Sequence, residues 1–200
     1  AVDRGVDAGV SDDFDGDVRP QGNGFDIGYD ESPYTYAPPL CFTSLDGATT
    51  FAGTPDAQAV RDAIAAANPG DTVRIAGYCA GAVEVDGAID GNGNTNNEVA
   101  WSTKPLTLAG GYTITNWTLP APIANPTILD AQQGGRVLVS TQPVTLRGFT
   151  MQNGFATDGG ALNATDAVTM TDMMVISNTV TGQGGGISVV GPLSIRNSAF

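Results

Sequence analysis

Three aspartates that alternate near the start of the chain are the first residues whose spacing could bind a metal. Asp13, Asp15 and Asp17 stand in the stretch DFDGD. Alternating carboxylates are typical of the first ligands of a calcium loop, because Ca²⁺ takes several oxygen ligands. Gly16 precedes the third acid, however, and the twelfth position of such a loop is Gly24 rather than a glutamate. The segment is therefore a candidate calcium site, and a solvated acidic turn is the alternative.

The two cysteines are the next residues with chemical potential. They are Cys41 and Cys79, and the chain has no histidine. Two thiols without histidine make a poor zinc site, because structural zinc takes four Cys or His ligands. We expect a disulfide, which would close a loop of about 38 residues and contribute roughly 3–4 kcal/mol in the chain-entropy model. Two buried thiols are the alternative. A disulfide would imply an oxidising, extracytoplasmic compartment.

Catalytic machinery is hard to assemble from this composition. Without histidine, Ser-His-Asp and Cys-His nucleophiles are excluded, which leaves carboxylate chemistry and elimination reactions. The candidate carboxylate pairs are Asp86 with Asp90 and Asp166 with Asp172. The first pair lies in a Gly/Asn loop and the second within one repeat unit, so neither predicts two carboxylates facing each other. The candidate bases are Lys104, Arg147 and Arg196. We expect Arg147 and Arg196 to be solvent-facing strand residues and Lys104 to lie at the edge of a loop, and we predict no catalytic residue.

Aromatic and asparagine residues suggest contacts with carbohydrate. Trp117 lies in the long proline-rich stretch YTITNWTLPAPIANPT, and long loops often carry function. We expect its ring either to stack on a sugar or, together with Trp101 and Tyr112, to pack over the end of the fold. Asn116 and Asn163 each begin an Asn-X-Thr sequon and are candidate glycosylation sites.

Composition restricts the class of protein further. The net charge is −13, and no cationic patch is present that could displace the counterions of a nucleic acid, so nucleic-acid binding is excluded. A membrane-spanning helix needs an apolar run of about 18 residues or more, and because the sequence has none, no transmembrane segment is predicted. Charged residues make up only 14% of the chain, and 27 residues are glycine. This composition favours many short strands joined by tight turns.

The chain divides into three zones. The first zone, residues 1–36, is acidic and rich in glycine. The second, residues 32–40, contains three prolines, which predict a stiff linker. The third, residues 41–200, is predicted to be a new domain. The new domain contains one helix, predicted at about 55–67. Thr54 can cap it, a proline suits its first position, and Asn-Pro-Gly ends it.

The remainder of the chain alternates with period two and repeats. The similar stretches VTLR, VTMT and LSIR begin at Val144, Val168 and Leu193. The spacing between these starts is roughly 25 residues. A repeat of this length with several short strands in each period indicates a parallel β-helix. An up-and-down barrel or a sandwich would alternate without this register.

These stretches resemble a known family. GDTVRIAGYCAG, LTLAGGYTITNW, NPTILDAQQGGRVLVS and VTLRGFTMQNG resemble the opening coils of right-handed parallel β-helix proteins of bacterial cell surfaces, which are relatives of the polymorphic outer-membrane-protein repeats. The resemblance implies an all-β right-handed parallel β-helix (solenoid) with one N-terminal capping α-helix and paired cysteines. The spacing of the repeated stretches predicts coils of about 24–25 residues. The resemblance also implies that 1–36 is the closing segment of a preceding β-helix domain. The fold hosts lyases, hydrolases, adhesins and inert stalks, so it does not fix an activity.

From these observations we expect a non-enzymatic structural or interaction segment of an extracellular or cell-surface protein. Residues 193–200 form an apolar strand with no cap after it, so either the chain continues or another copy covers this edge. Self-association end to end, with strands near 6–10 and 25–29 as partners, would give a fibre, sheath or adhesive stalk. No cofactor is required, and calcium is the candidate ligand. The alternative is a polysaccharide-acting β-helix lyase or hydrolase, or a carbohydrate-binding module.

Overall fold

The chain forms two compact units, Ala1–Pro38 and Pro39–Phe200. The computed structural model describes residues 5–12, 16, 18–20, 25, 27, 40–89, 95–182 and 184–200. In the described part of the first unit, Asp12 and Val18 form an isolated antiparallel bridge, and the strand expected near 6–10 does not form. The strand expected near 25–29 lies mostly outside the described residues.

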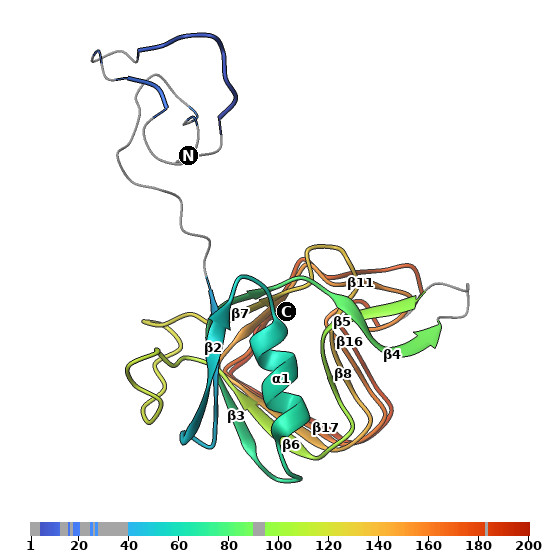
Figure 1. Ribbon diagram of the computed structural model, residues 1–200. Coiled ribbons are helices and arrows are strands. Elements are labelled where there is room, and N and C mark those ends of the chain that lie inside the picture. Colours follow the sequence, from blue (N-terminus) through green and yellow to red (C-terminus); the bar gives the residue numbers. More distant parts are fainter. Residues whose placement is uncertain are drawn as a thin grey trace. The chain divides into compact units, whose positions relative to one another are not determined.

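The second unit is mostly β-structure, as the composition predicts (Figure 1). Its described helix is α1 (Gln58–Ala66), which is too short to cross a membrane. The largest sheet contains, in spatial order, β14 (Met174–Ile176), β10 (Thr150–Gln152), β7 (Ile128–Asp130), β3 (Thr72–Ala80), β6 (Leu106–Ala109), β9 (Val144–Arg147), β13 (Val168–Thr171) and β17 (Leu193–Arg196), with β1 (Cys41–Leu45) and β2 (Thr49–Thr54) beside β3. A second sheet contains β16 (Ile187–Val189), β12 (Leu162–Ala164), β8 (Arg136–Ser140), β5 (Thr95–Ser102) and β4 (Val83–Ile89). A small third sheet pairs β11 (Phe155–Ala156) with β15 (Thr179–Val180).

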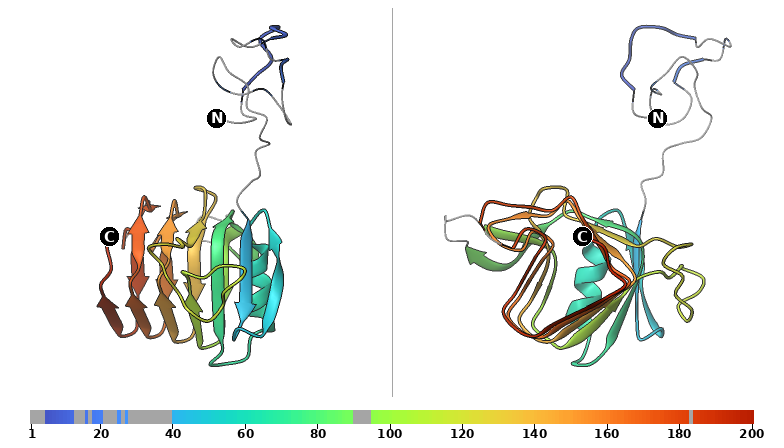
Figure 2. Two further views of the ribbon diagram at one scale, coloured as in Figure 1. Left: turned by 90° about the vertical axis from the view of Figure 1, so that its left-hand side faces the viewer. Right: turned by 180° about the vertical axis from the view of Figure 1, so that it is seen from behind.

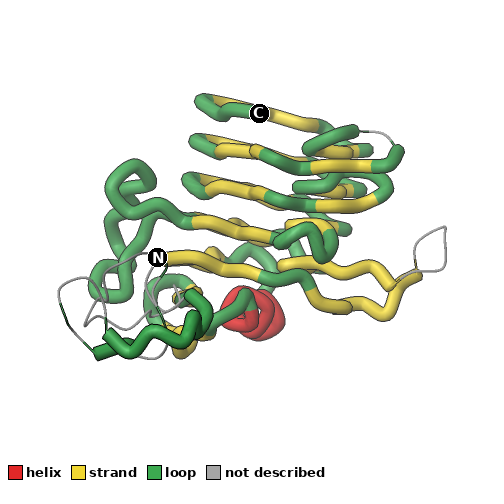
Figure 3. The backbone as a smooth tube through the Cα atoms, turned by 90° about the horizontal axis from the view of Figure 1, so that it is seen from above, coloured by secondary structure: helices red, strands yellow, loops and turns green. Residues whose placement is uncertain are grey.

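The chain visits the two larger sheets repeatedly in the same order. We call each passage a coil: β7, β8 and β9 form one coil, β10, β12 and β13 the next, and β14, β16 and β17 the one after. Strands of successive coils pair in parallel, and the coils lie side by side as stacked rungs (Figures 2 and 3). Antiparallel pairs within the described residues occur where β1 meets β2 and β3, and where β4 meets β5.

The repeat seen in the sequence is confirmed by the strand register. Val168 pairs with Val144 on one side and with Leu193 on the other. Along these strands the side chains alternate: Val144 and Val168 are at most 2% exposed, whereas Thr145 and Thr169 face outward. Period-two alternation therefore places one apolar side of every coil in a shared core, with the other side in water.

Helix α1 covers the core at the first coil (Figures 1 and 3). It begins later than the sequence predicts, because Ala57 rather than Thr54 occupies the N-cap position. Thr54 still serves the helix start: its Oγ1 accepts a hydrogen bond from the Ala59 N–H (3.2 Å) and donates one to the Asp56 carbonyl (2.7 Å). The helix buries one small apolar face, which consists of Ala59, Val60, Ala63 and Ile64.

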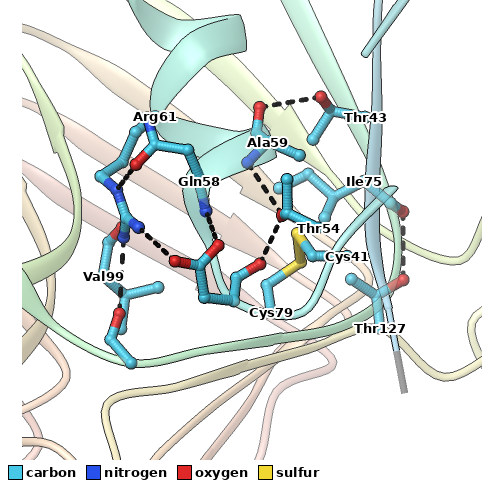
Figure 4. Close-up of a disulfide and its surroundings, with 12 residues drawn as sticks. Cys41, Thr43, Thr54, Gln58, Ala59, Arg61, Ile75, Cys79, Val99 and Thr127 are labelled. Carbon is cyan, nitrogen blue, oxygen red and sulfur yellow. Dashed lines mark hydrogen bonds and ion pairs between the residues drawn. A yellow bond between two sulfur atoms is a disulfide. The ribbon is translucent and has the colours of Figure 1, made fainter. Parts of the chain in front are cut away.

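The predicted disulfide between Cys41 and Cys79 is confirmed. It joins β1 to β3, with the two Cα atoms 4.6 Å apart and both residues fully buried. Figure 4 shows it beside the start of α1, where Thr43 Oγ1 donates to the Ala59 carbonyl at 2.9 Å. The bridge and this hydrogen bond tie β1 to both β3 and the helix, so they stabilise the covered end of the core.

Candidate interaction site at the 110–127 loop

A long loop leaves the stack at a corner that other coils turn with two residues. Between β9 and β10 the corner consists of Gly148 and Phe149, and between β13 and β14 it consists of Asp172 and Met173. Between β6 and β7, residues 110–127 take the same place. The loop is therefore an insertion at a repeated corner, and it lies over the matching corners of the following coils (Figure 2, left, yellow-green).

Buried hydrogen bonds fix the base of this loop. Thr127 is 1% exposed, and its Oγ1 accepts from the Gly111 N–H at 2.9 Å and donates to the Ile75 carbonyl at 3.1 Å. Figure 4 shows the second of these bonds. The Ala121 N–H also donates to the Gly111 carbonyl at 2.7 Å. The two ends of the loop are thus bonded to each other and to β3.

Close packing of proline on glycine fixes the middle of the loop. A Cβ atom added to Gly148 would lie 2.7 Å from Cγ of Pro122, and one added to Gly111 would lie 2.8 Å from the nitrogen of the same ring. Both glycines also have positive φ angles, +66° and +86°, which side-chain-bearing residues rarely adopt. Only glycine therefore lets Pro122 sit this close to the corner.

The aromatic residues of the loop pack against the outside of the stack. The rings of Tyr112 and Trp117 lie 6.0 Å apart, and Tyr112 is buried against Ala76 and Ala109 while Trp117 packs partly buried beside it. The Arg74 guanidinium lies 5.8 Å from the Tyr112 ring centre. Trp117 is thus packed on the outer face of the sheet, and its predicted contact with a sugar stays a prediction.

The same loop presents aliphatic side chains to solvent. Ile114, Leu119 and Ile123 are 58%, 72% and 101% exposed. Of these three, Ile123 borders a mainly apolar groove of about 890 Å³, which lies between the loop and the corners of three successive coils. Its lining consists of Pro122, Ile123, Pro126, Thr127, Gly148, Phe149, Thr150, Asp172, Met173, Met174, Asn197, Ser198 and Ala199. Exposed aliphatic groups beside an apolar groove are characteristic of an interaction surface.

Lys104, the candidate base, is used by the fold. Its Nζ donates to the carbonyls of Ile64 (3.2 Å), Ala65 (2.8 Å) and Ala67 (2.7 Å) at the end of α1. These carbonyls lack partners within the helix, and a cation is favoured at this end of the helix dipole. Lys104 therefore fixes the covering helix to the segment after β5.

Among the described residues, the other candidates considered for catalysis do not gather at one site. Arg147 and Arg196 both pair with Thr171, one on each side, so they lie in one column two coils apart and are exposed. Asp166 and Asp172 lie beyond opposite ends of β13. Asp86 lies in β4 with its side chain outside the described atoms, and Asp90 lies outside the described residues.

A buried carboxylate and a buried ion pair were not recognised in the sequence. Asp130 is 3% exposed and accepts hydrogen bonds from the Tyr78 hydroxyl, the Gln152 amide and the Asn153 amide. Burial alone would raise the pKa of Asp130. These hydrogen bonds and one from the Gln132 N–H together lower the pKa by more than burial raises it, so the pKa falls below its usual value. The carboxylate thus links three strands of successive coils, β3, β7 and β10, as an ion.

The buried ion pair lies between adjacent coils. Glu98 on β5 pairs in register with Arg136 on β8, and Nη1 of Arg136 lies 3.7 Å from Oε1 of Glu98. Their side chains are 1% and 10% exposed. Arg136 also donates to the carbonyls of Asp158 and Gly159 in the following coil. One guanidinium therefore holds parts of three coils together.

The structure places the predicted metal and glycan residues in different parts of the chain. Asp13, Asp15 and Asp17 lie outside the described residues, and within the described part no three His, Cys, Asp or Glu side chains gather as metal ligands. Asn116 is exposed, and its Oδ1 accepts from the Thr118 N–H at 3.0 Å. Asn163 is half-buried in β12. Calcium binding and glycosylation both stay predictions.

Comparison with known proteins adds no family. The sequence matches no protein-family model, and it has no match among curated proteins or among solved structures.

Proposed function

We propose that this chain is a structural and interaction segment of an extracellular right-handed parallel β-helix. Parallel, in-register pairing of successive coils, with a repeat of roughly 25 residues, supports the β-helix class. Within that class we propose a cell-surface stalk, sheath or fibre segment. The Cys41–Cys79 disulfide supports an oxidising location.

One observation carries the non-enzymatic part of this proposal. Three buried or partly buried charged side chains of the described stack are bonded to backbone carbonyls or to groups of neighbouring coils. Lys104 binds the end of α1, Asp130 joins three strands, and Arg136 joins Glu98 to the next coil. Hydrogen bonds to the rest of the stack already occupy these groups, so they are not free to act as general acids or bases on a substrate. We therefore assign these groups a structural role, in which they stabilise the stack.

The stack also supports assembly along its axis. Leu193 and Ile195 on β17 are 45% and 41% exposed, whereas their partners on β13, Val168 and Met170, are 1% and 0% exposed because another coil covers them. A further coil of parallel strands would bury Leu193 and Ile195 in the same way and pair the open edge of β17. We propose that strands outside residues 41–200 cover this edge; because α1 covers the opposite end of the stack, end-to-end contact between two copies would join their two open edges.

Electron microscopy of the full chain at rising protein concentration tests this proposal. We expect elongated particles, and we expect the double variant Leu193→Lys/Ile195→Lys to shorten them, because the lysines would be buried at each junction. The matched control is Thr145→Lys/Thr169→Lys, which places two lysines on the outer sheet face. Particles of unchanged length in the edge variant, or release of sugars from a polysaccharide by the wild-type chain, would contradict the proposal.

A further inference from the structure

We propose that the outer face of the largest sheet binds an acidic polysaccharide that runs along the stack, with its carboxylates bound by three arginines. This inference rests on the interaction role proposed above, and it adds the surface and the chemical class of the partner. The surface, which we call the arginine strip, is the outward side of β3, β6, β9, β13 and β17, which lie next to each other in this order (Figure 2).

The three arginines are far apart in the sequence, and strand register brings them into one column. Arg74 pairs with Ala109, and Ala109 pairs with Arg147. Thr171 then pairs with Arg147 on one side and with Arg196 on the other. An arginine therefore stands on every second strand of the strip. Because neighbouring strands lie about 4.8 Å apart, successive arginines have their Cα atoms roughly 10 Å apart.

These arginines are the cations of the stack that the fold does not bond. Residues 41–200 contain six cations, and three of them, Arg61, Lys104 and Arg136, bond to carbonyl or carboxylate oxygens of the stack. The other three form the column, and within the described residues their guanidinium groups make no hydrogen bond or ion pair. Arg74 lies 5.8 Å from the Tyr112 ring centre, and its Nε is buried without a hydrogen-bond partner.

A carboxylate is the anion that suits this column. The N–H groups of a guanidinium form a planar fork that binds both oxygens of a carboxylate at once. The five strands of the strip contain no aspartate or glutamate. The flanking acids Asp71, Asp166 and Asp172 lie beyond the strand ends, so the strip itself is free of repelling carboxylates.

A row of hydroxyl groups runs beside the arginine column. Its members pair in succession from β3 to β17 and are Thr72, Thr107, Thr145, Thr169 and Ser194. Each stands two residues before the column in its strand, so it points to the same outward face, and each is half-buried or exposed. Because a hydroxyl both donates and accepts hydrogen bonds, this row suits the hydroxyl groups of sugars.

An aromatic surface lies between the first two arginines. Ala109 occupies the column between Arg74 and Arg147, and Tyr112 packs on it with the partly buried Trp117 beside it. The remaining exposed part of Trp117 is an apolar surface on which a sugar ring can stack.

An extended sugar polymer matches the strip better than other anions do. The strip runs for about 20 Å along the stack, which favours an extended chain over a small anion. Two residues of an extended sugar chain are about as long as the step between arginines, so a carboxylate on every second sugar fits the column. A nucleic acid carries a charge on every nucleotide, and three arginines neutralise few of these charges.

The net charge of −13 leaves room for this contact. Residues 1–38 belong to the other compact unit and hold nine acids and two arginines, so they carry −7 of that charge. At physiological salt, charges on the surface are largely screened beyond about 8 Å, so the arginines dominate the field at the strip. We therefore expect binding that is weak and that weakens further as salt rises.

Isothermal titration calorimetry of the full chain with a hyaluronan hexasaccharide, in which glucuronate alternates with N-acetylglucosamine, tests the proposal. We expect the dissociation constant to rise at least about 10-fold in Arg147→Gln/Arg196→Gln, because two charge-assisted contacts are lost. The matched control is Thr157→Asp/Thr181→Asp, which gives the same net charge through exposed positions beside the small third sheet and should bind normally. The methyl ester of the same hexasaccharide keeps its shape without its charges and should bind at least about 10-fold more weakly.

Each result decides the question. Loss of binding in the arginine variant and with the ester, together with normal binding in the control variant, supports the strip. No binding by the wild-type chain, equal binding of acid and ester, or an equal loss in both variants overturns it. Tighter binding of a thymidylate hexanucleotide than of the sugar also overturns it and assigns the strip to nucleic acid.

The same variants separate this proposal from the assembly of the stack. Arg147→Gln/Arg196→Gln leaves Leu193 and Ile195 in place, so the length of particles in electron microscopy should not change. Failure of sugar binding therefore leaves assembly at the open edge standing. Cleavage of hyaluronan by the wild-type chain would contradict the non-enzymatic role and leave the strip as a binding surface.

Discussion

The buried ion pair between β5 and β8 gives the sharpest stability prediction. Replacing Arg136 by methionine keeps most of its length but removes the cation 3.7 Å from the Glu98 carboxylate, whose side chain is 1% exposed. It also removes the donor to the Asp158 and Gly159 carbonyls. Removing one partner of a buried pair typically costs about 3–5 kcal/mol, because the other charge stays buried. We therefore expect Arg136→Met to lower the free energy of unfolding by about 3–5 kcal/mol at pH 7.

Urea unfolding followed by circular dichroism measures this loss, and two further variants separate its causes. Glu98→Gln should cost less, about 1–3 kcal/mol, because the guanidinium keeps its bonds to both carbonyls. The double variant Glu98→Leu/Arg136→Met should be more stable than Arg136→Met alone, because no buried charge is left uncompensated. A loss below about 1 kcal/mol for Arg136→Met, or a double variant that is no more stable than Arg136→Met alone, would refute the reasoning.

Three further predictions concern single contacts and use the same unfolding assay. Cys41→Ser should lower the free energy of unfolding by about 3–4 kcal/mol, and an unchanged urea midpoint would show that the bridge is not needed. Lys104→Met should cost about 1–2 kcal/mol by freeing the last carbonyls of α1, whereas no loss would mean that water replaces the ammonium group. The pKa of Asp130 is lower in the folded state than in the unfolded state, so its carboxylate stabilises the fold at pH values above the unfolded-state pKa of about 3.9. This contribution disappears as the pH falls through the folded-state pKa. Asp130→Asn should therefore lose about 1.5–3 kcal/mol at pH 7 and little at low pH, and a pH-independent loss would contradict this role.

Much of the stack could be predicted from the sequence because its physical signal is periodic. The repeated positions Val144, Val168 and Leu193 carry apolar residues at a nearly fixed spacing, and parallel pairing in register puts them in one column. The helix was predicted from its alanine-rich apolar face and its end signals. Its start was placed too early, because Thr54 caps through a hydrogen bond to Ala59 without entering the helix.

The interaction site and the buried charges could not be predicted in the same way. The sequence shows that residues 110–127 form a long proline-rich segment, but only the fold shows that they replace a two-residue corner and border a groove. Glu98 and Arg136 are far apart in sequence and meet because β5 and β8 pair in register. From the sequence, Lys104 is a candidate base, and only its distances to the carbonyls of α1 show that it binds the end of the helix. Contacts between coils depend on register, which no local pattern around these residues specifies.

The central claim is that this chain works by associating through the apolar surfaces of a rigid stack. The most direct measurement is the weight-average mass of the full chain by sedimentation over a wide concentration range in high salt. The account predicts a mass that rises reversibly above the 20.4 kDa of one chain as concentration increases. A mass that stays at one chain throughout would contradict it.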